Sequence, residues 1–338
     1  MTGKERVRAA VRGESVDHVP MVPISMMIAA DLIGVPYRTY ATDWRELVRG
    51  QLAFTEKFGI DHVSVISDPA TEAADCGAEI SWHDHQPPAL SEERSLIRDK
   101  ETLATLRAPD PSAGPRMSNR VRAVEELVAQ AGSEKLIEGW VEGPIAEASD
   151  LRGINRVMMD FFDDPEFVND LLAFVFEMEM AYARAQIEAG AEIIGIGDAA
   201  ASLLGPELYE EFALPYHRRY IETIHAMGAM VRLHICGDSR PVLPFLPQLK
   251  PDIMDLDSIA PVADARLHGG PTQVLTGNID PVRVLKEGTP ETVTAAIEQC
   301  FRDAGSRAYL VAAGCEVPRG TPDANLLALG QFALGNWY

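Results

Sequence analysis

The stretch that decides the fold is residues 192–238, because it contains one structural unit twice. EIIGIGD (192–198) and MVRLHICGD (230–238) are short apolar runs that end at polar or glycine residues. Between them, Glu207–Met227 has apolar residues spaced near 3.6 apart, which predicts a helix, and Gly205-Pro206-Glu207 is typical of a helix start. Strands that are apolar along their length and alternate with helices are typical of a parallel sheet covered by helices.

The same unit recurs along the whole chain, and we count eight apolar runs. They are His18–Ile24, His62–Ile66, Lys135–Val141, Glu192–Ile196, Met230–Ile235, Ile253–Leu256, Gln273–Thr276 and Ala308–Ala312. The stretches with helical spacing between them include Trp44–Phe58, Asn119–Ala131, Pro165–Ala189 and Glu207–Met227. Eight such units close into a (β/α)8 TIM barrel, so we predict an α/β protein in which residues 1–338 form a single barrel domain.

Two further features refine this fold prediction. The interval between Ile66 and Lys135 exceeds one helix, and its middle, His83–Ser112, is rich in proline and charge. We therefore expect a surface excursion after the second strand. An open doubly wound sheet is the alternative, but no Gly-x-Gly-x-x-Gly follows the first run to support a dinucleotide site.

The composition limits the classes of protein and partner. The 338 residues are 46% hydrophobic and 24% charged, a globular balance that excludes a disordered chain. The 30 Lys and Arg against 51 Asp and Glu give a formal charge of −21, so we expect neither nucleic acid nor a membrane surface as partner. Four cysteines are too few for a disulfide scaffold, and no secretory signal or long apolar run is visible, so we expect a cytoplasmic protein.

Polar side chains follow the predicted strands, at the ends that share one mouth in a barrel. They are Asp68, Glu142, Asp198, His234, Cys236, Asp257, Asn278 and Cys315. A polar residue after a strand is usually only a loop residue or a helix cap, so each of them alone is weak support for a site. Their convergence on one mouth makes the set a candidate site.

The segment Leu233–Asp238 is the sharpest local feature. His234 and Cys236 are two residues apart and therefore face the same side of a strand. With Cys315 in the same mouth, they offer nitrogen and sulfur ligands that suit Zn²⁺, and three protein ligands with an open fourth position are typical of catalytic zinc. The alternative is that both cysteines are small buried hydrophobes and His234 is a core histidine.

The remaining two cysteines and two of the histidines give no support for a functional site. Cys300 lies in a helical pattern and is expected to pack, and Cys76 has no evident partner. His217 and His225 fall within a predicted helix, where we expect them on a solvated face.

Three segments give the chain a recognisable pattern: HICGD (234–238), GNIDP (277–281) and GCEVP (314–318). They resemble the uroporphyrinogen decarboxylase superfamily, and the His-x-Cys with a distant Gly-Cys resembles its zinc-dependent corrinoid methyltransferase branch. Members of that branch pass a methyl group from methylcobamide to coenzyme M. The resemblance runs from Arg6 to Asn325, almost end to end.

The resemblance implies Zn²⁺ held by His234, Cys236 and Cys315, and we prefer Asp257, in the Asp255-Leu256-Asp257 segment, as fourth ligand. It also implies a methyl-corrinoid carried by a separate partner protein, and a small-molecule acceptor such as a thiol or tetrahydrofolate. A zinc-bound thiol would ionise at neutral pH and attack the methyl group of the methyl–Co(III) corrinoid, releasing Co(I). We add Asp68 to the three ligands as catalytic, and we expect Glu142, Asp198, Asn278 and Arg319 to bind substrate. Arg319 and Arg240 are the candidate partners of a sulfonate, and a homodimer is expected by analogy only.

Two other functions stay open at this point. The decarboxylases carry an arginine-rich stretch after the first strand, whereas Met21–Met27 contains no Arg or Lys to hold a substrate with eight carboxylates. Asp68 nevertheless falls where the decarboxylases keep an aspartate, so decarboxylation is the second enzymatic interpretation. A corrinoid- or tetrapyrrole-binding module without catalysis is the third. The sequence does not determine the acceptor or the direction of transfer.

Overall fold

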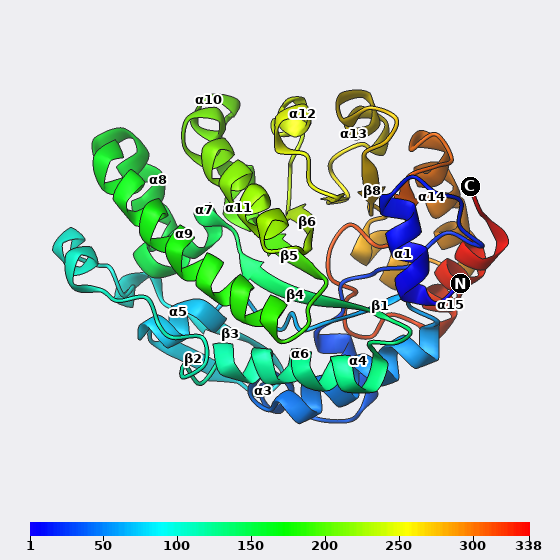
Figure 1. Ribbon diagram of the computed structural model, residues 1–338, viewed down its shortest axis with the longest axis horizontal. Coiled ribbons are helices and arrows are strands. Elements are labelled where there is room, and N and C mark those ends of the chain that lie inside the picture. The colour runs from blue at the N-terminus through cyan, green and yellow to red at the C-terminus, as the bar shows by residue number, and fades with distance from the viewer.

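The computed structural model describes residues 1–338, in which parallel strands curve around a common axis inside a layer of helices (Figure 1). Seven strands pair in the order β1-β4-β5-β6-β7-β8-β9, and every neighbouring pair is parallel. These strands are β1 (His62–Ser64), β4 (Leu136–Glu142), β5 (Ile193–Gly197), β6 (Met230–Ile235), β7 (Ile253–Leu256), β8 (Val274–Thr276) and β9 (Tyr309–Leu310). The predicted barrel class is confirmed.

The predicted first run, His18–Ile24, closes the barrel without forming a regular strand. On one side the Val22 N–H donates to the Val311 carbonyl at 2.9 Å, and on the other the Asp61 N–H donates to the Met21 carbonyl at 3.0 Å. Pro20 and Pro23 have no N–H to donate, which limits this segment to isolated bridges. It therefore occupies the place of the eighth strand between β9 and β1.

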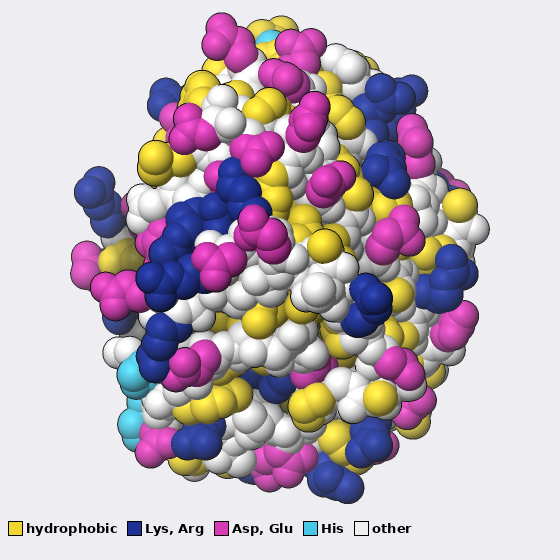
Figure 2. Space-filling view, turned by 90° about the vertical axis from the view of Figure 1, so that its left-hand side faces the viewer, with side chains coloured by type: hydrophobic (Ala, Val, Ile, Leu, Met, Phe, Trp, Pro, Cys, Tyr) yellow, Lys and Arg dark blue, Asp and Glu magenta, His cyan; other side chains and the backbone are white.

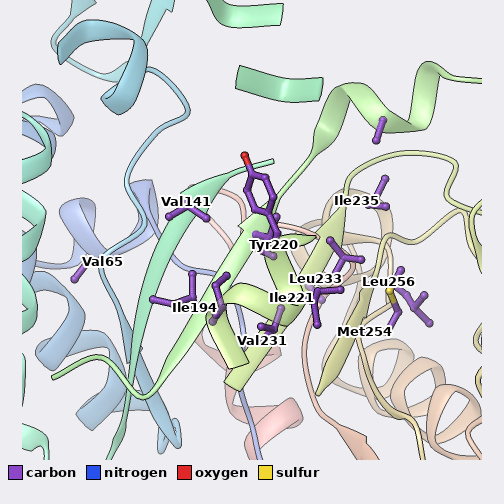
Figure 3. Close-up of a cluster of buried hydrophobic side chains, with 14 of the residues drawn as sticks. Val65, Val141, Ile194, Tyr220, Ile221, Val231, Leu233, Ile235, Met254 and Leu256 are labelled. Carbon is purple, nitrogen blue, oxygen red and sulfur yellow. The ribbon is translucent and has the colours of Figure 1, made fainter. Parts of the chain in front are cut away.

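Side chains alternate between the barrel interior and the helices. Along β6, Val231, Leu233 and Ile235 belong to the buried cluster that includes Tyr220 and Ile221 of α11 (Figure 3). The residues between them, such as Arg232 and His234, therefore point into the barrel, because successive side chains of a strand face opposite sides. This alternation brings the functional side chains to the axis.

Helices cover the outside of the barrel, and α1 closes the end at which the strands begin. They are α1 (Gly3–Val11), α2 (Met27–Leu32), α3 (Tyr37–Thr42), α4 (Trp44–Phe58), α5 (Thr71–Cys76), α6 (Met117–Ala131), α7 (Pro144–Arg152), α8 (Ile154–Asp163), α9 (Pro165–Glu188), α10 (Pro206–Leu208), α11 (Leu214–Ala226), α12 (Leu246–Leu249), α13 (Val262–Gly269), α14 (Pro290–Asp303) and α15 (Asp323–Gly335). Val7 and Ala10 of α1 pack against Leu136 and Ile193, at the start of β4 and β5. None of the helices combines the length and apolar character needed to cross a membrane.

The predicted helix over Glu207–Met227 is divided into α10, a π-helical segment at Tyr209–Ala213, and α11. The predicted excursion is an antiparallel hairpin of β2 (Ile80–His83) and β3 (Gln86–Leu90), followed by two short 3₁₀ turns.

Acidic and basic side chains lie side by side on the face drawn in Figure 2, with hydrophobic side chains between them. The prediction that all of residues 1–338 form one domain stays a prediction.

Candidate metal centre

Three potential metal ligands meet at the mouth of the barrel. The nearest ligand atoms of His234, Cys236 and Cys315 all lie within 4.8 Å of one another. The two Sγ atoms are 3.8 Å apart, and His234 Nε2 is 2.9 Å from Cys236 Sγ. A disulfide would need about 2.05 Å between the sulfurs, whereas two thiolates on one tetrahedral zinc with bonds of about 2.3 Å lie about 3.8 Å apart. The donor set and the sulfur spacing therefore fit zinc.

The backbone places Cys315 beside β6 through a close approach at Gly314. The Gly314 N–H donates to the Ile279 carbonyl at 2.9 Å, which continues the parallel pairing of β8 and β9 past the ends of both strands. A Cβ at Gly314 would lie 2.5 Å from the Ser258 backbone nitrogen, so this approach requires glycine. The geometry of a barrel, in which strand ends share a mouth, thus joins residues 79 positions apart.

Asp255 lies behind His234, on the side away from the sulfurs. Its Oδ2 is 3.3 Å from His234 Nδ1 and 2.6 Å from the Arg232 guanidinium. Burial disfavours the charged His234 ring, but the Asp255 charge outweighs it and raises the pKa of His234 to about 10. A carboxylate on the second ring nitrogen orients a histidine that binds metal through the first. Asp255 is thus the member of the Asp255-Leu256-Asp257 segment that supports a ligand.

The two thiols share one proton in the metal-free protein. Their mutual hydrogen bond, with help from His234, lowers the pKa of Cys315 to about 5, and the same bond raises the pKa of Cys236. One thiolate is therefore available before any ion binds, and zinc binding needs to displace the proton of Cys236 and one proton of the His234 ring.

Asp257 and Asp68 lie near the centre with their carboxylates already engaged. Asp257 accepts hydrogen bonds from the Gly237 N–H at 2.7 Å and the Ser258 hydroxyl at 2.9 Å, and it is not in the group of three ligands. Its role as fourth ligand stays a prediction. Asp68 Oδ2 is 2.6 Å from Arg116 Nη2, so the Asp68 carboxylate has a buried cationic partner.

A cavity of about 160 Å³ adjoins the three ligands. Its walls are formed by Ile24, Met26, Ile66, Asp68, Pro69, Trp140, Glu142, Gly197, Ala199, His234, Cys236, Cys315 and Glu316. A second cavity of about 430 Å³ shares Pro69, Glu142 and Ala199 with the first. Two predicted residues, Asp68 and Glu142, thus reach the space beside the metal ligands, and no Lys or Arg side chain does.

The other predicted substrate-binding residues do not line either cavity. Asp198 is buried and accepts hydrogen bonds from the Ala146 N–H at 2.8 Å and from His217 Nε2 at 2.9 Å. The Asn278 side chain donates to the Asp257 carbonyl at 3.1 Å, and Arg319 pairs with Asp31 near the surface. Their roles in substrate binding stay predictions.

His217 corrects one expectation from the sequence, since it is fully buried and not solvated. Its other ring nitrogen lies 2.9 Å from the Tyr209 hydroxyl, in the π-helical segment that helical spacing alone did not predict. Arg240 pairs with the neighbouring Asp238 and is exposed.

Glu316 and Trp140 are cavity residues that the sequence reasoning missed. Glu316 accepts a hydrogen bond from the Met27 N–H at 2.8 Å, and burial raises the pKa of its carboxyl to about 7. The Trp140 ring lies across Gly195 and Gly197, where a Cβ would approach the indole to 2.1 and 2.8 Å respectively. Trp140 lies two residues before Glu142 in β4 and therefore faces the same side of the strand, which is the signal that could have predicted it.

Comparison with known proteins identifies the family. The uroporphyrinogen decarboxylase (URO-D) family profile matches residues 2–333. The chain belongs to this family. It is 29% identical over 339 residues to methylcobamide:CoM methyltransferase MtbA of Methanosarcina mazei, covering 98% of this chain and 97% of that protein. It is also 27% identical to a methylated-thiol–coenzyme M methyltransferase of the same organism, over 97% of this chain and 88% of the relative.

Further comparisons include a uroporphyrinogen decarboxylase and two solved structures, and the solved structures show the fold alone. The uroporphyrinogen decarboxylase of Crocosphaera subtropica is 27% identical over 80% of this chain and 76% of its own. Among solved structures, a methyltransferase from Methanosarcina mazei has a TM-score of 0.90 over 98% of each chain at 23% identity. A B12-independent methionine synthase from a Shewanella species has a TM-score of 0.59 at 15% identity. The chain is therefore a URO-D family member that resembles methyltransferases end to end and has a His-Cys-Cys cluster able to bind zinc.

Proposed function

We propose that this protein is a zinc-dependent methyltransferase that moves a methyl group between a protein-bound methyl-corrinoid and a small thiol. The observation that carries the proposal is the convergence of His234, Cys236 and Cys315 beside a cavity at the barrel mouth. The end-to-end similarity to methylcobamide:CoM methyltransferases supports it. A corrinoid protein would then be the partner that docks at the mouth.

Each residue of the centre has a distinct task in this proposal. His234, Cys236 and Cys315 would hold Zn²⁺, which supplies the charge that keeps a bound substrate sulfur ionised at neutral pH. Asp255 fixes the orientation of the His234 ring. Ile24, Met26 and Ile66 form apolar walls that limit the access of water to the reacting sulfur.

The walls of the cavity favour this function over decarboxylation of a porphyrinogen. A substrate with eight carboxylates needs cationic side chains, yet the cavity contains Asp68, Glu142 and Glu316 and no Lys or Arg. The Met21–Met27 segment, which contributes Met26 to the wall, supplies none either.

The test is demethylation of free methylcobalamin by the purified protein, with thiols and tetrahydrofolate as acceptors, followed by the absorbance of the methyl–cobalt bond. We expect about one zinc per chain and turnover with a thiol. A chelator should abolish turnover and added Zn²⁺ should restore it. Binding of cobalamin with no turnover and no zinc would indicate the non-catalytic module instead, and turnover with tetrahydrofolate alone would exclude a thiol acceptor.

A further inference from the structure

The two cavities at the barrel mouth, which share three wall residues, have an unusual distribution of charge. The cavity beside the metal ligands contains the carboxyl groups of Asp68, Glu142 and Glu316, and the second adds Glu92 and Asp150. Neither cavity contains a Lys or Arg side chain, and His234 is the one basic residue in their walls. A ligand that enters here meets carboxyl groups on several sides.

Only part of this acidity is neutralised by the protein. Asp68 pairs with Arg116, which lies behind it and outside the cavity wall. The carboxyl of Glu142 has no basic partner, although the residue is only 7% exposed and faces both cavities. Burial, followed by the charge of Glu72, raises the pKa of Glu142 well above its usual range. A cation in the cavity would relieve this unfavourable burial, whereas an anion would increase it.

Glu316 extends the acidic wall to the metal ligands themselves. It follows Cys315 directly and is anchored by the Met27 N–H at 2.8 Å, which leaves its second oxygen free of any backbone donor. The charge of Arg319 compensates Glu316 only in part, because Arg319 lies outside the cavity wall and is paired with Asp31. Arg240 is exposed and paired with Asp238. A sulfonate would therefore find carboxyl groups where it needs guanidinium or ammonium groups.

From this distribution we infer that the thiol handled at this centre carries a cationic, hydrogen-bond-donating end such as an ammonium group, and not an anionic end such as a sulfonate. The inference rests on the proposed function, because it names the class of acceptor at the same site. A compact amino-thiol would place its sulfur at the ligand cluster, its short chain along Ile24, Met26 and Ile66, and its ammonium group against Glu142 and Glu316.

The experiment uses three thiols with the same two-carbon chain: 2-aminoethanethiol, 2-mercaptoethanol and 2-mercaptoethanesulfonate. Binding to the zinc-loaded protein is measured by calorimetric titration, and kcat/KM is measured with methylcobalamin. We expect the amine to bind at least about tenfold more tightly than the sulfonate, with the alcohol between them. In Glu142→Gln and Glu316→Gln, the amine-to-sulfonate ratio should fall by about tenfold. Because each ratio is compared with that of the unmodified protein, the intrinsic reactivities of the thiols cancel.

Glu207→Gln is the matched control, since Glu207 is exposed and outside both cavities but undergoes the same change of charge. Its ratio should equal that of the unmodified protein, and zinc content verifies that every variant is folded and loaded. Equal binding of the three thiols, or preference for the sulfonate, would overturn the inference while leaving methyl transfer intact. Absence of turnover with all three would contradict the proposed function, and the binding order would still decide the inference.

Discussion

Glu138 and Glu142 lie on one strand at different depths of the barrel, and their carboxyl groups have different electrostatic surroundings. Both point inward from β4 and both are almost completely buried. Glu138 lies 3.3 Å from Arg232 and 3.3 Å from His62, and the Arg232 charge outweighs burial and lowers its pKa. Glu142 faces a cavity without a basic partner, and its pKa is raised.

The difference separates two polar layers inside the barrel. The lower layer consists of Glu138, Arg232 and Asp255, and the upper layer consists of Cys236, Cys315 and Glu142. In the lower layer, Arg232 also pairs with Asp255, so the buried charges compensate one another inside the protein. In the upper layer, the thiols of Cys236 and Cys315 and the carboxyl of Glu142 border open space. Buried polar groups without a partner are unfavourable, so a ligand that pairs with them in the cavity would be stabilised there. The two layers should consequently respond differently to mutation.

The largest effect is expected in the upper layer, from Cys236→Ala or Cys315→Ala. Either variant removes one of three ligands, and we expect zinc to fall from about one per chain to near zero. Methyl transfer should fall below detection. Metal analysis after gel filtration measures the zinc content, and the methylcobalamin assay measures methyl transfer.

The other two cysteines provide the matched controls for this experiment. Cys300 packs in α14 and Cys76 contacts Met178, and neither is in the ligand cluster. Cys76→Ala and Cys300→Ala should therefore keep their zinc. Retention of zinc by both Cys236→Ala and Cys315→Ala would show that the cluster is not the metal site.

In the lower layer, Arg232→Met should affect folding more than chemistry. It leaves Glu138 and Asp255 buried without their shared cation, and removing one partner of a buried pair costs about 3–5 kcal/mol. Urea denaturation should show this loss in the free energy of unfolding. Arg240→Met removes an exposed ion pair with Asp238 and should cost about 1 kcal/mol or less. Equal costs for the two variants would show that the buried ion pairs of Arg232 contribute no more to stability than an exposed pair.

Asp255 belongs to both layers, and Asp255→Asn should weaken the metal site without abolishing it. Loss of the charge behind His234 should reduce zinc affinity by about 10–100-fold, as measured by competition with a chromogenic chelator. Asp252→Asn is the control, because Asp252 pairs with His225 at 2.7 Å in the same chemical arrangement but away from the cluster. An identical zinc affinity in Asp255→Asn and the unmodified protein would remove Asp255 from the site.

The layers also explain which features could be predicted from the sequence. The strands and the pair of His234 and Cys236 follow from local patterns, since apolar runs mark the strands and a two-residue spacing sets the face of β6. Cys315 is 79 positions away and could be added only because strand ends share one mouth in a barrel. The place of Asp255 behind His234 does not follow from such patterns, because it depends on which carboxylate the neighbouring strand brings there. His217 was misassigned for a similar reason: its partner Asp198 is 19 positions away, and a helical pattern carries no sign of it.

The smallest effect is expected from His225 itself, the partially exposed counterpart of His234. Its hydrogen bond to Asp252 raises its pKa in the folded protein, so the pair stabilises the fold below the unfolded pKa of about 6.5. This contribution is lost as the pH rises through the folded value, because the ring then loses its proton in both states. Since the His225 side chain is 40% exposed, solvent screening limits the contribution to about 1 kcal/mol or less. His225→Gln should therefore destabilise the protein more at about pH 5.5 than at about pH 8.5 in urea denaturation. A cost that grows with pH would show that the ring acts through its neutral form, as a buried histidine does.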